Sequence, residues 1–160
     1  MRIGDGEAFV MYYHGIPGMI RLLKEERSSL EDEYSGLRAT RIDGLPHGPG
    51  AGDPTAALAE RAEEKGLQNR LCEIDVRLQI LSGDRAAIRG SLDALRSEYK
   101  QAIFMRCLNG YSWSRIAAEM GVPDSTARHR YRRAIERLGE ELEDTPMVDE
   151  LLRRARRARP

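Results

Sequence analysis

Residues Ser112 to Ser125 read SWSRIAAEMGVPDS, and the order of small, polar and apolar side chains in this stretch decides the fold around it. Ser112 is a typical N-cap, and the apolar residues after it share one face of a helix that Gly121 is expected to end. Ala117 is small enough to let a second helix approach, and Val122 fills the angle between the two helices. A further helix is expected from Ser125 onward. The stretch therefore predicts a helix-turn-helix.

The helix after the turn divides its side chains between two faces. Its apolar residues recur at helical spacing and are expected to pack inward: Ala127, Tyr131, Ala134, Ile135 and Leu138. The opposite face carries the candidate base-reading residues: Ser125, Thr126, Arg128, His129, Arg132 and Arg133. Short hydroxyls at a helix N-terminus, with arginines one turn apart, suit the major groove of DNA, because an arginine can bind guanine O6 and N7 together. The alternative is a solvated basic face without a ligand.

Further polar and basic residues are candidates for contacts to the DNA backbone: Ser112, Arg115, Arg130, Arg153 and Arg154. The chain has 26 Lys and Arg against 26 Asp and Glu, so its formal net charge of zero does not by itself favour a nucleic-acid partner. Basic residues nevertheless outnumber acidic ones between Gln101 and Leu138, and arginines dominate the last residues after an acidic stretch. The positive charge is therefore concentrated in the C-terminal part.

Two long helices are predicted before this motif, so the chain is expected to have an all-α fold. Apolar residues step by four and three from Ile16 to Leu37, and again from Leu67 to Tyr99, which is the spacing of a coiled-coil seam. Residues 43–54 contain four glycines and three prolines and are predicted to form a loop. An antiparallel hairpin would let the two seams cover each other, whereas a homodimer through this helical arm would use the same stripes. The sequence leaves both arrangements open.

Glycine and proline set the expected boundaries of these elements. The first helix is expected to begin at Gly15-Ile16-Pro17, because proline is tolerated in a first helical turn, and no clear period precedes it. Ser82-Gly83-Asp84 is expected to interrupt the second helix, since glycine disfavours a helix interior and the flanking residues are good caps. The resulting divisions are an unassigned segment over residues 1–15, the helical arm over 16–90, the helix-turn-helix domain over 91–145 and a basic tail over 146–160.

The segment from Tyr99 to Leu138 resembles region four of the bacterial sigma factors, and in particular the phage-encoded late-gene regulators of the ArpU and RinA types. It shares with them the Tyr-Ser-Trp sequence at Tyr111, the Ile-Ala pair at Ile116, Gly-Val at the turn, and a third helix ending in Arg-Ala-Ile-x-x-Leu. The resemblance implies a sequence-specific transcription regulator encoded by a phage or prophage. It further implies double-stranded DNA as a partner, RNA polymerase as an additional contact, and the cytoplasm of a bacterial host cell as the location.

Two positions depart from the family's pattern. Arg115 stands where the family usually has Glu, so the reciprocal capping box cannot form and any role of that acidic residue cannot be carried over. Pro123 stands where the third helix usually begins with Ser. The cap is therefore expected to pass to Asp124, and the helix to start about one residue later.

Two other functions would also use a helix-turn-helix joined to a helical arm. One is a small-terminase-like DNA-packaging subunit, which would assemble into a ring of many copies. The other is a helical interaction protein, whose DNA affinity would be no greater than its charge explains.

Enzymatic activity is not expected. The sequence has no glycine loop at phosphate-binding spacing and no nucleophile with a convincing base, so no catalytic residue is assigned. Cys72 and Cys107 lie within apolar helical patterns and are interpreted as small core residues, without a disulfide. No metal site, no cofactor and no membrane-spanning segment is expected.

Overall fold

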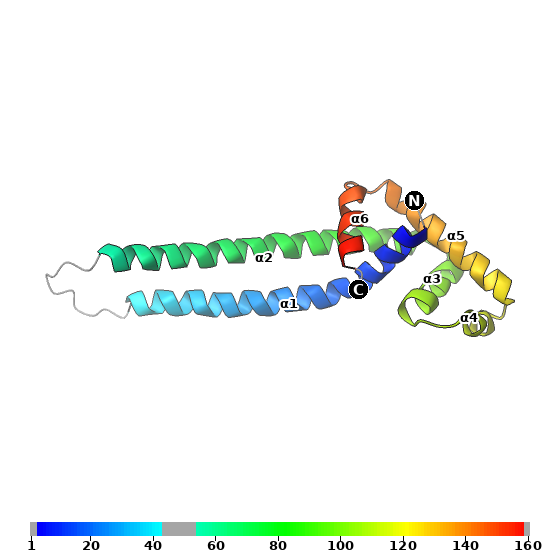
Figure 1. The fold of residues 1–160 in the computed structure, drawn as a ribbon, viewed down its shortest axis with the longest axis horizontal. Coiled ribbons are helices and arrows are strands. Elements are labelled where there is room, and N and C mark those ends of the chain that lie inside the picture. Colours follow the sequence, from blue (N-terminus) through cyan, green and yellow to red (C-terminus); the bar gives the residue numbers. More distant parts are fainter. Residues whose placement is uncertain (1–2, 43–53, 159–160) are drawn as a thin grey trace. The chain divides into compact units, whose positions relative to one another are not determined.

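The structure is a computed structural model that describes residues 3–42 and 54–158, and every regular element in these ranges is helical (Figure 1). In chain order the elements are α1 (Ile3–Ile42), α2 (Pro54–Ala94), α3 (Ser97–Ile103), the π-helical turn η1 (Phe104–Leu108), α4 (Trp113–Met120), α5 (Asp124–Glu143) and α6 (Val148–Arg157). The predicted all-α fold, with long helices followed by a C-terminal helix-turn-helix, is confirmed. The predicted loop lies outside the described residues except for Pro54, which is the first residue of α2.

The chain divides into two compact units, which are described separately. The head unit comprises Met1–Pro17 and Ser82–Pro160, and the arm unit comprises Gly18–Leu81. Both α1 and α2 contribute residues to each unit. None of the described helices is long and apolar enough to cross a membrane.

In the arm unit, α1 and α2 run antiparallel and pack along the predicted seam (Figure 1). Leu30, Leu67 and Ile74 are buried, and five partly buried residues pack against them: Leu23, Tyr34, Leu37, Leu71 and Leu78. Arg27, which interrupts the seam of α1, donates from Nε to Asp75 Oδ1 at 2.8 Å across the helix pair. The two apolar stripes therefore cover each other within one chain.

The first helix starts earlier than the sequence predicted. α1 begins at Ile3 and continues through Pro17, so the expected start at Gly15-Ile16-Pro17 is wrong. The apolar residues before the proline supply the reason, since Phe9, Val10 and Tyr12 are almost fully buried in the head unit. Burying each contributes about 1.5–3 kcal/mol, which together exceeds the roughly 3 kcal/mol cost of a proline inside a helix.

The second helix is also continuous where an interruption was predicted. α2 runs through Ser82-Gly83-Asp84 to Ala94, and Asp84 does not cap a new helix. Asp84 is 7% exposed, and its Oδ2 accepts a hydrogen bond from Tyr12 Oη at 2.7 Å. Ile88, one turn further along α2, is fully buried in the head unit, and its burial favours the continuous helix despite the glycine.

The basic C-terminal segment is folded as α6 and belongs to the head unit. Its apolar side is buried, with Leu151 2% and Ala155 1% exposed. On its basic side, Arg156 donates from Nη2 to Asp5 Oδ1 in α1 at 2.6 Å, and Arg154 donates to Asp84 in α2. The helix is therefore attached through both apolar contacts and ion pairs.

Candidate DNA interface

The turn between α4 and α5 has the geometry that the sequence predicted. Ser112 caps α4, and its Oγ accepts a hydrogen bond from the Arg115 backbone N–H at 3.3 Å. The helix ends at Gly121, whose φ of 63° lies in the left-handed region that favours glycine. Val122 N–H then donates to the carbonyl oxygen of Ala117 at 3.0 Å, which closes the turn. These contacts fix where α5 begins.

The start of α5 differs by one residue from the prediction. Pro123 occupies the N-cap position and makes no side-chain cap, while Asp124 is the first residue of the helix. The expected cap by Asp124 is therefore wrong. Proline fits this position because its φ, here −62°, is already fixed near the value that the entry into the helix needs. The carboxylate of Asp124 lies in the first turn, where it interacts favourably with the helix dipole.

The inner face of α5 is buried as predicted. Its predicted inward residues are all nearly inaccessible: Ala127, Tyr131, Ala134, Ile135 and Leu138. Ala127 packs with Ile116 and Ala117 of α4, and Trp113, Met120 and Val122 surround this small core. The burial of α5 on this side leaves its opposite side free to meet a ligand.

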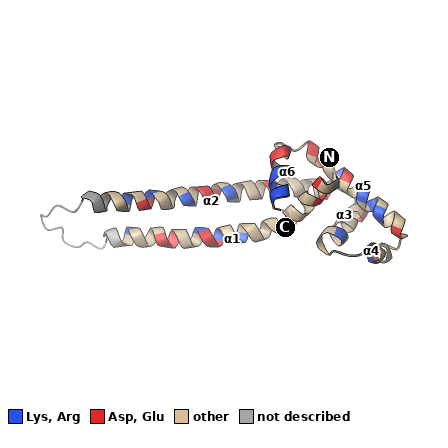
Figure 2. Ribbon diagram, viewed as in Figure 1, with Lys and Arg blue, Asp and Glu red and all other residues tan. Residues whose placement is uncertain are grey.

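The outer face of α5 carries the predicted base-reading residues. The side chains exposed on it are Ser125, Arg128, His129, Arg132 and Arg133, and Thr126 is half-buried. Figure 2 shows basic residues along this helix. Arg133 Nη1 lies 3.2 Å from Glu136 Oε2, whereas Arg132 makes no ion pair within the described ranges. Arg132 thus offers its guanidinium without first giving up an acidic partner.

Trp113 connects the two helices of the motif through its ring. The guanidinium carbon of Arg128 lies 5.6 Å from the Trp113 ring centre, and that of Arg106 lies 4.8 Å from it. Tyr131 meets the same ring edge-on, with centres 5.3 Å apart. Cation–π contacts of this kind contribute about 0.5–2 kcal/mol and restrict the arginine side chain. This cluster was not predicted from the sequence, although a tryptophan directly after the Ser112 cap was a signal for it.

The candidate backbone-contact residues fall into two groups. Ser112 and Arg115 lie at the start of α4, where the Arg115 guanidinium carbon is 3.7 Å from the Tyr111 ring centre. The others already have acidic neighbours, because Arg130 pairs with Glu98 of α3 at 3.5 Å, Arg153 with Glu150 at 3.6 Å, and Arg154 with Asp84 at 2.6 Å. The structure brings the first group to the helix-turn-helix and places the two tail arginines on α6.

A hydrogen-bonded network anchors α5 from beneath. Tyr131 Oη donates to Glu7 Oε1 of α1 at 2.5 Å and lies 3.4 Å from Cys107 Sγ. Burial raises the pKa of Tyr131 far above its ordinary value, and its hydrogen bonds with Cys107 and Glu7 act in the same direction. The phenol therefore stays neutral and able to donate. Nothing in the sequence indicated that Glu7, in the unassigned segment, would contact α5.

The two cysteines lie in different surroundings. Cys107 is partly buried against Tyr131, and burial raises the pKa of its thiol, so its interpretation as a packing residue fits. Cys72 is exposed on α2, and its interpretation as a core residue is therefore wrong. The seam of α2 passes through Leu71, one residue away, which turns Cys72 outward. Among the described residues, no group of three or more potential ligands is placed to bind a metal ion.

These features together define a helix-turn-helix DNA-binding domain: a capped helix, a glycine stop, a short turn, and a helix with one buried and one basic face. Comparison with known families makes this more specific. Residues 85–138 match the family described as sigma-70, region 4, which is a DNA-binding regulatory domain. No curated protein and no solved structure matches the chain.

Proposed function

We propose that this protein is a sequence-specific transcription regulator of a phage or prophage, acting in the cytoplasm of the bacterial host and resembling the ArpU and RinA types. The observation that carries this proposal is the outer face of α5, where Arg128 and Arg132 are exposed one turn apart beside the hydroxyl of Ser125. The match of residues 85–138 to sigma-70 region 4 supports DNA as the ligand of this face.

The proposed contacts separate base reading from backbone binding. We assign the reading of bases in the major groove to Ser125, Thr126, Arg128, His129, Arg132 and Arg133. Backbone contacts are assigned to Ser112, Arg115, Arg130 and Arg153, with sequence-independent affinity as their main effect. Arg154 is engaged with the buried Asp84, so its proposed contribution is to hold α6 in place beside Arg153.

RNA polymerase is the second proposed partner, on the basis of the region 4 match. A homodimer through the arm would have to use the outer surfaces of α1 and α2, because the seam between them is already covered. Apolar side chains are available there, with Leu22 63%, Val76 49% and Ile80 40% exposed. Sedimentation equilibrium with and without DNA tests this, and a ring of many subunits would instead indicate a DNA-packaging subunit.

The deciding experiment is selection of bound fragments from a bacterial and phage DNA library, followed by titration of the selected site. Arg128→Ala should weaken binding to that site by about 1–3 kcal/mol and relax the preference at one base pair. Arg89→Ala is the matched control, since Arg89 is an exposed arginine on α2 whose partner is Asp93. Selection of fragments without a shared sequence would contradict the proposal and favour an interaction protein.

A further inference from the structure

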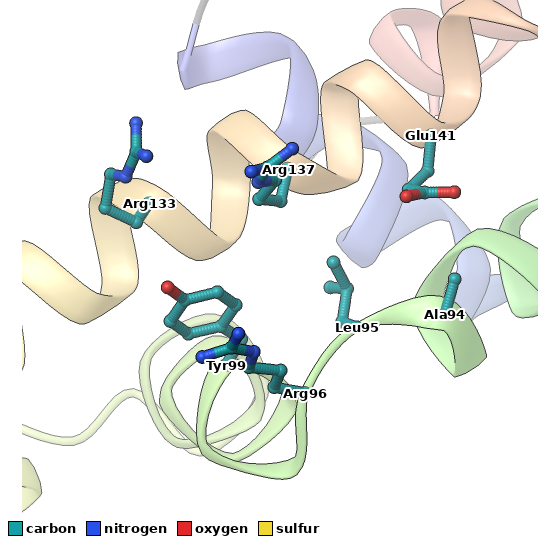
Figure 3. A pocket seen from close by; sticks show the side chains of 7 residues that line it. All are labelled: Ala94, Leu95, Arg96, Tyr99, Arg133, Arg137 and Glu141. Carbon is teal, nitrogen blue, oxygen red and sulfur yellow. The ribbon is translucent and has the colours of Figure 1, made fainter.

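A pocket of about 280 Å³ lies in the head unit between α5 and the junction of α2 with α3. Ala94 and Leu95 supply the apolar part of its lining, and three arginines, Arg96, Arg133 and Arg137, line it together with Tyr99. Figure 3 shows Arg96 at the junction and Tyr99 in α3, with Arg133 and Arg137 on the facing helix α5. Glu141 contributes the one acidic side chain of the lining. The pocket is therefore strongly positive on balance.

The arginines of this pocket are available to an incoming anion. Arg96 is exposed and forms no ion pair within the described part of the chain. Arg137 Nη1 lies 2.7 Å from Glu140 Oε2, and Arg133 Nη1 lies 3.2 Å from Glu136 Oε2, but all four of these side chains are exposed to solvent. Exposed pairs of this kind contribute only about 0–1 kcal/mol, so an anion can replace either glutamate at little cost. None of these arginines is needed to neutralise a buried acid, unlike Arg154.

We propose that this pocket binds a phosphate group. Guanidinium groups bind phosphate oxygens through paired, charge-assisted hydrogen bonds, and three of them line the same hollow as the hydroxyl-bearing Tyr99. The phosphate has two possible sources, which are a small phosphate ester and the backbone of the DNA that α5 contacts. Only the second source rests on the proposed function. The negative charge of Glu141 repels an anionic ligand and lowers its affinity for the pocket.

The free-ester source is tested on the full chain by NMR, following the arginine Nε–H signals during titration with inorganic phosphate and with adenosine monophosphate. Saturable shifts at Arg96 and Arg137 are expected, beyond those in sodium chloride of equal ionic strength. Arg96→Gln should weaken binding by about tenfold. Glu141→Gln should strengthen it, which a folding defect would not do, and Arg89→Gln should leave it unchanged.

The DNA source is tested by the salt dependence of binding to duplex DNA. Arg96→Gln should make the slope of log K against log salt shallower by up to about 0.9, the value of one phosphate contact, without changing the sequence preference. A positive result in either titration supports phosphate binding by the pocket and identifies the source of the phosphate. If no saturable binding is seen and the salt slope of the Arg96→Gln variant is unchanged, the proposed phosphate binding is wrong. Absence of any DNA binding by the unaltered protein would defeat the proposed function and leave the ester test valid.

Discussion

Arg154 of α6 binds both carboxylate oxygens of Asp84 in α2, with nitrogen–oxygen distances of 2.7 Å from Nε and 2.6 Å from Nη2. Tyr12 of α1 donates to the same carboxylate at 2.7 Å. Three helices of the head unit therefore meet at one buried charge. Because Asp84 is only 7% exposed, its charge depends on these partners to offset the loss of water.

Removing the guanidinium should destabilise the protein. Arg154→Ala is expected to lower the free energy of unfolding by about 3 kcal/mol, since it removes two of the hydrogen-bond donors of a buried carboxylate. Urea denaturation measures the effect. Arg153→Ala is the control, because Arg153 is 66% exposed and pairs with Glu150 only at 3.6 Å, so a loss below about 0.5 kcal/mol is expected. Equal losses of stability in both variants would show that the contact with Asp84 contributes no more to stability than the exposed pair of Arg153 does.

Alkaline pH should weaken the fold through its two buried tyrosines. Burial, with the hydrogen bonds to Asp84 and to Cys107 and Glu7, raises the pKa of Tyr12 and Tyr131 above the ordinary value of 10.0. The unfolded chain therefore loses these protons first. The stabilisation is fully present below about pH 10 and falls above it by up to about 1.4 kcal/mol per pH unit for each tyrosine.

Unfolding in urea at pH 9 and pH 11 tests this linkage with Tyr12→Phe and Tyr131→Phe. Each variant should lose less stability between the two pH values than the unaltered protein does. If stability falls by the same amount in all three proteins, groups other than these two tyrosines cause the loss of stability at alkaline pH.

Trp113 should report on the engagement of Arg128 by DNA. It is the single tryptophan of the chain, and the guanidinium of Arg128 lies over its ring. Binding that draws Arg128 toward a base should change the tryptophan emission, and Arg128→Ala should abolish this change. Trp113→Leu should reduce affinity for the selected site by about 0.5–1 kcal/mol through loss of this positioning. An emission change that persists in Arg128→Ala would separate Trp113 from base reading.

The attachment of α6 should depend on its buried side. Leu151→Ala is expected to cost about 2–4 kcal/mol of stability, because Leu151 is 2% exposed and its removal leaves a cavity. The neighbouring Leu152→Ala, at a half-buried position, should cost clearly less. Thermal or urea unfolding of the two variants gives the comparison. Equal and small losses would mean that α6 is held by its arginines alone.

Local signals made most of the helix-turn-helix predictable. The Ser112 cap, the left-handed Gly121 and the inward side of α5 each depend on residues within a few turns of one another, and all three are confirmed. The pairing of α1 with α2 was one of two arrangements that their seams allowed. This pairing could be identified only from the contacts around Leu30 and Ile74, because the spacing of apolar residues does not show which helix a seam packs against.

Long-range contacts account for what the sequence did not predict. Tyr131 and Glu7 are 124 positions apart, and Arg154 and Asp84 are 70 apart, so neither pair leaves a local pattern. Gly15, Pro17 and Gly83 look like helix breakers when read alone. Their helices persist because buried neighbours such as Phe9 and Ile88 outweigh these local preferences.

At Gly6, a residue of the N-terminal part of the chain packs directly against α5 in its C-terminal part. A Cβ at Gly6 would lie 2.6 Å from Ile135 Cγ2, so α1 approaches α5 at a place where only glycine fits. The head unit is thus assembled from both ends of the sequence, and the arm unit is an insertion between Pro17 and Ser82. A fragment limited to residues 85–160 would lack Gly6 and Glu7, through which α1 contacts Ile135 and Tyr131 of α5. Because the entropy of closing a loop rises only slowly with its length, the inserted arm can gain or lose residues while these contacts stay intact.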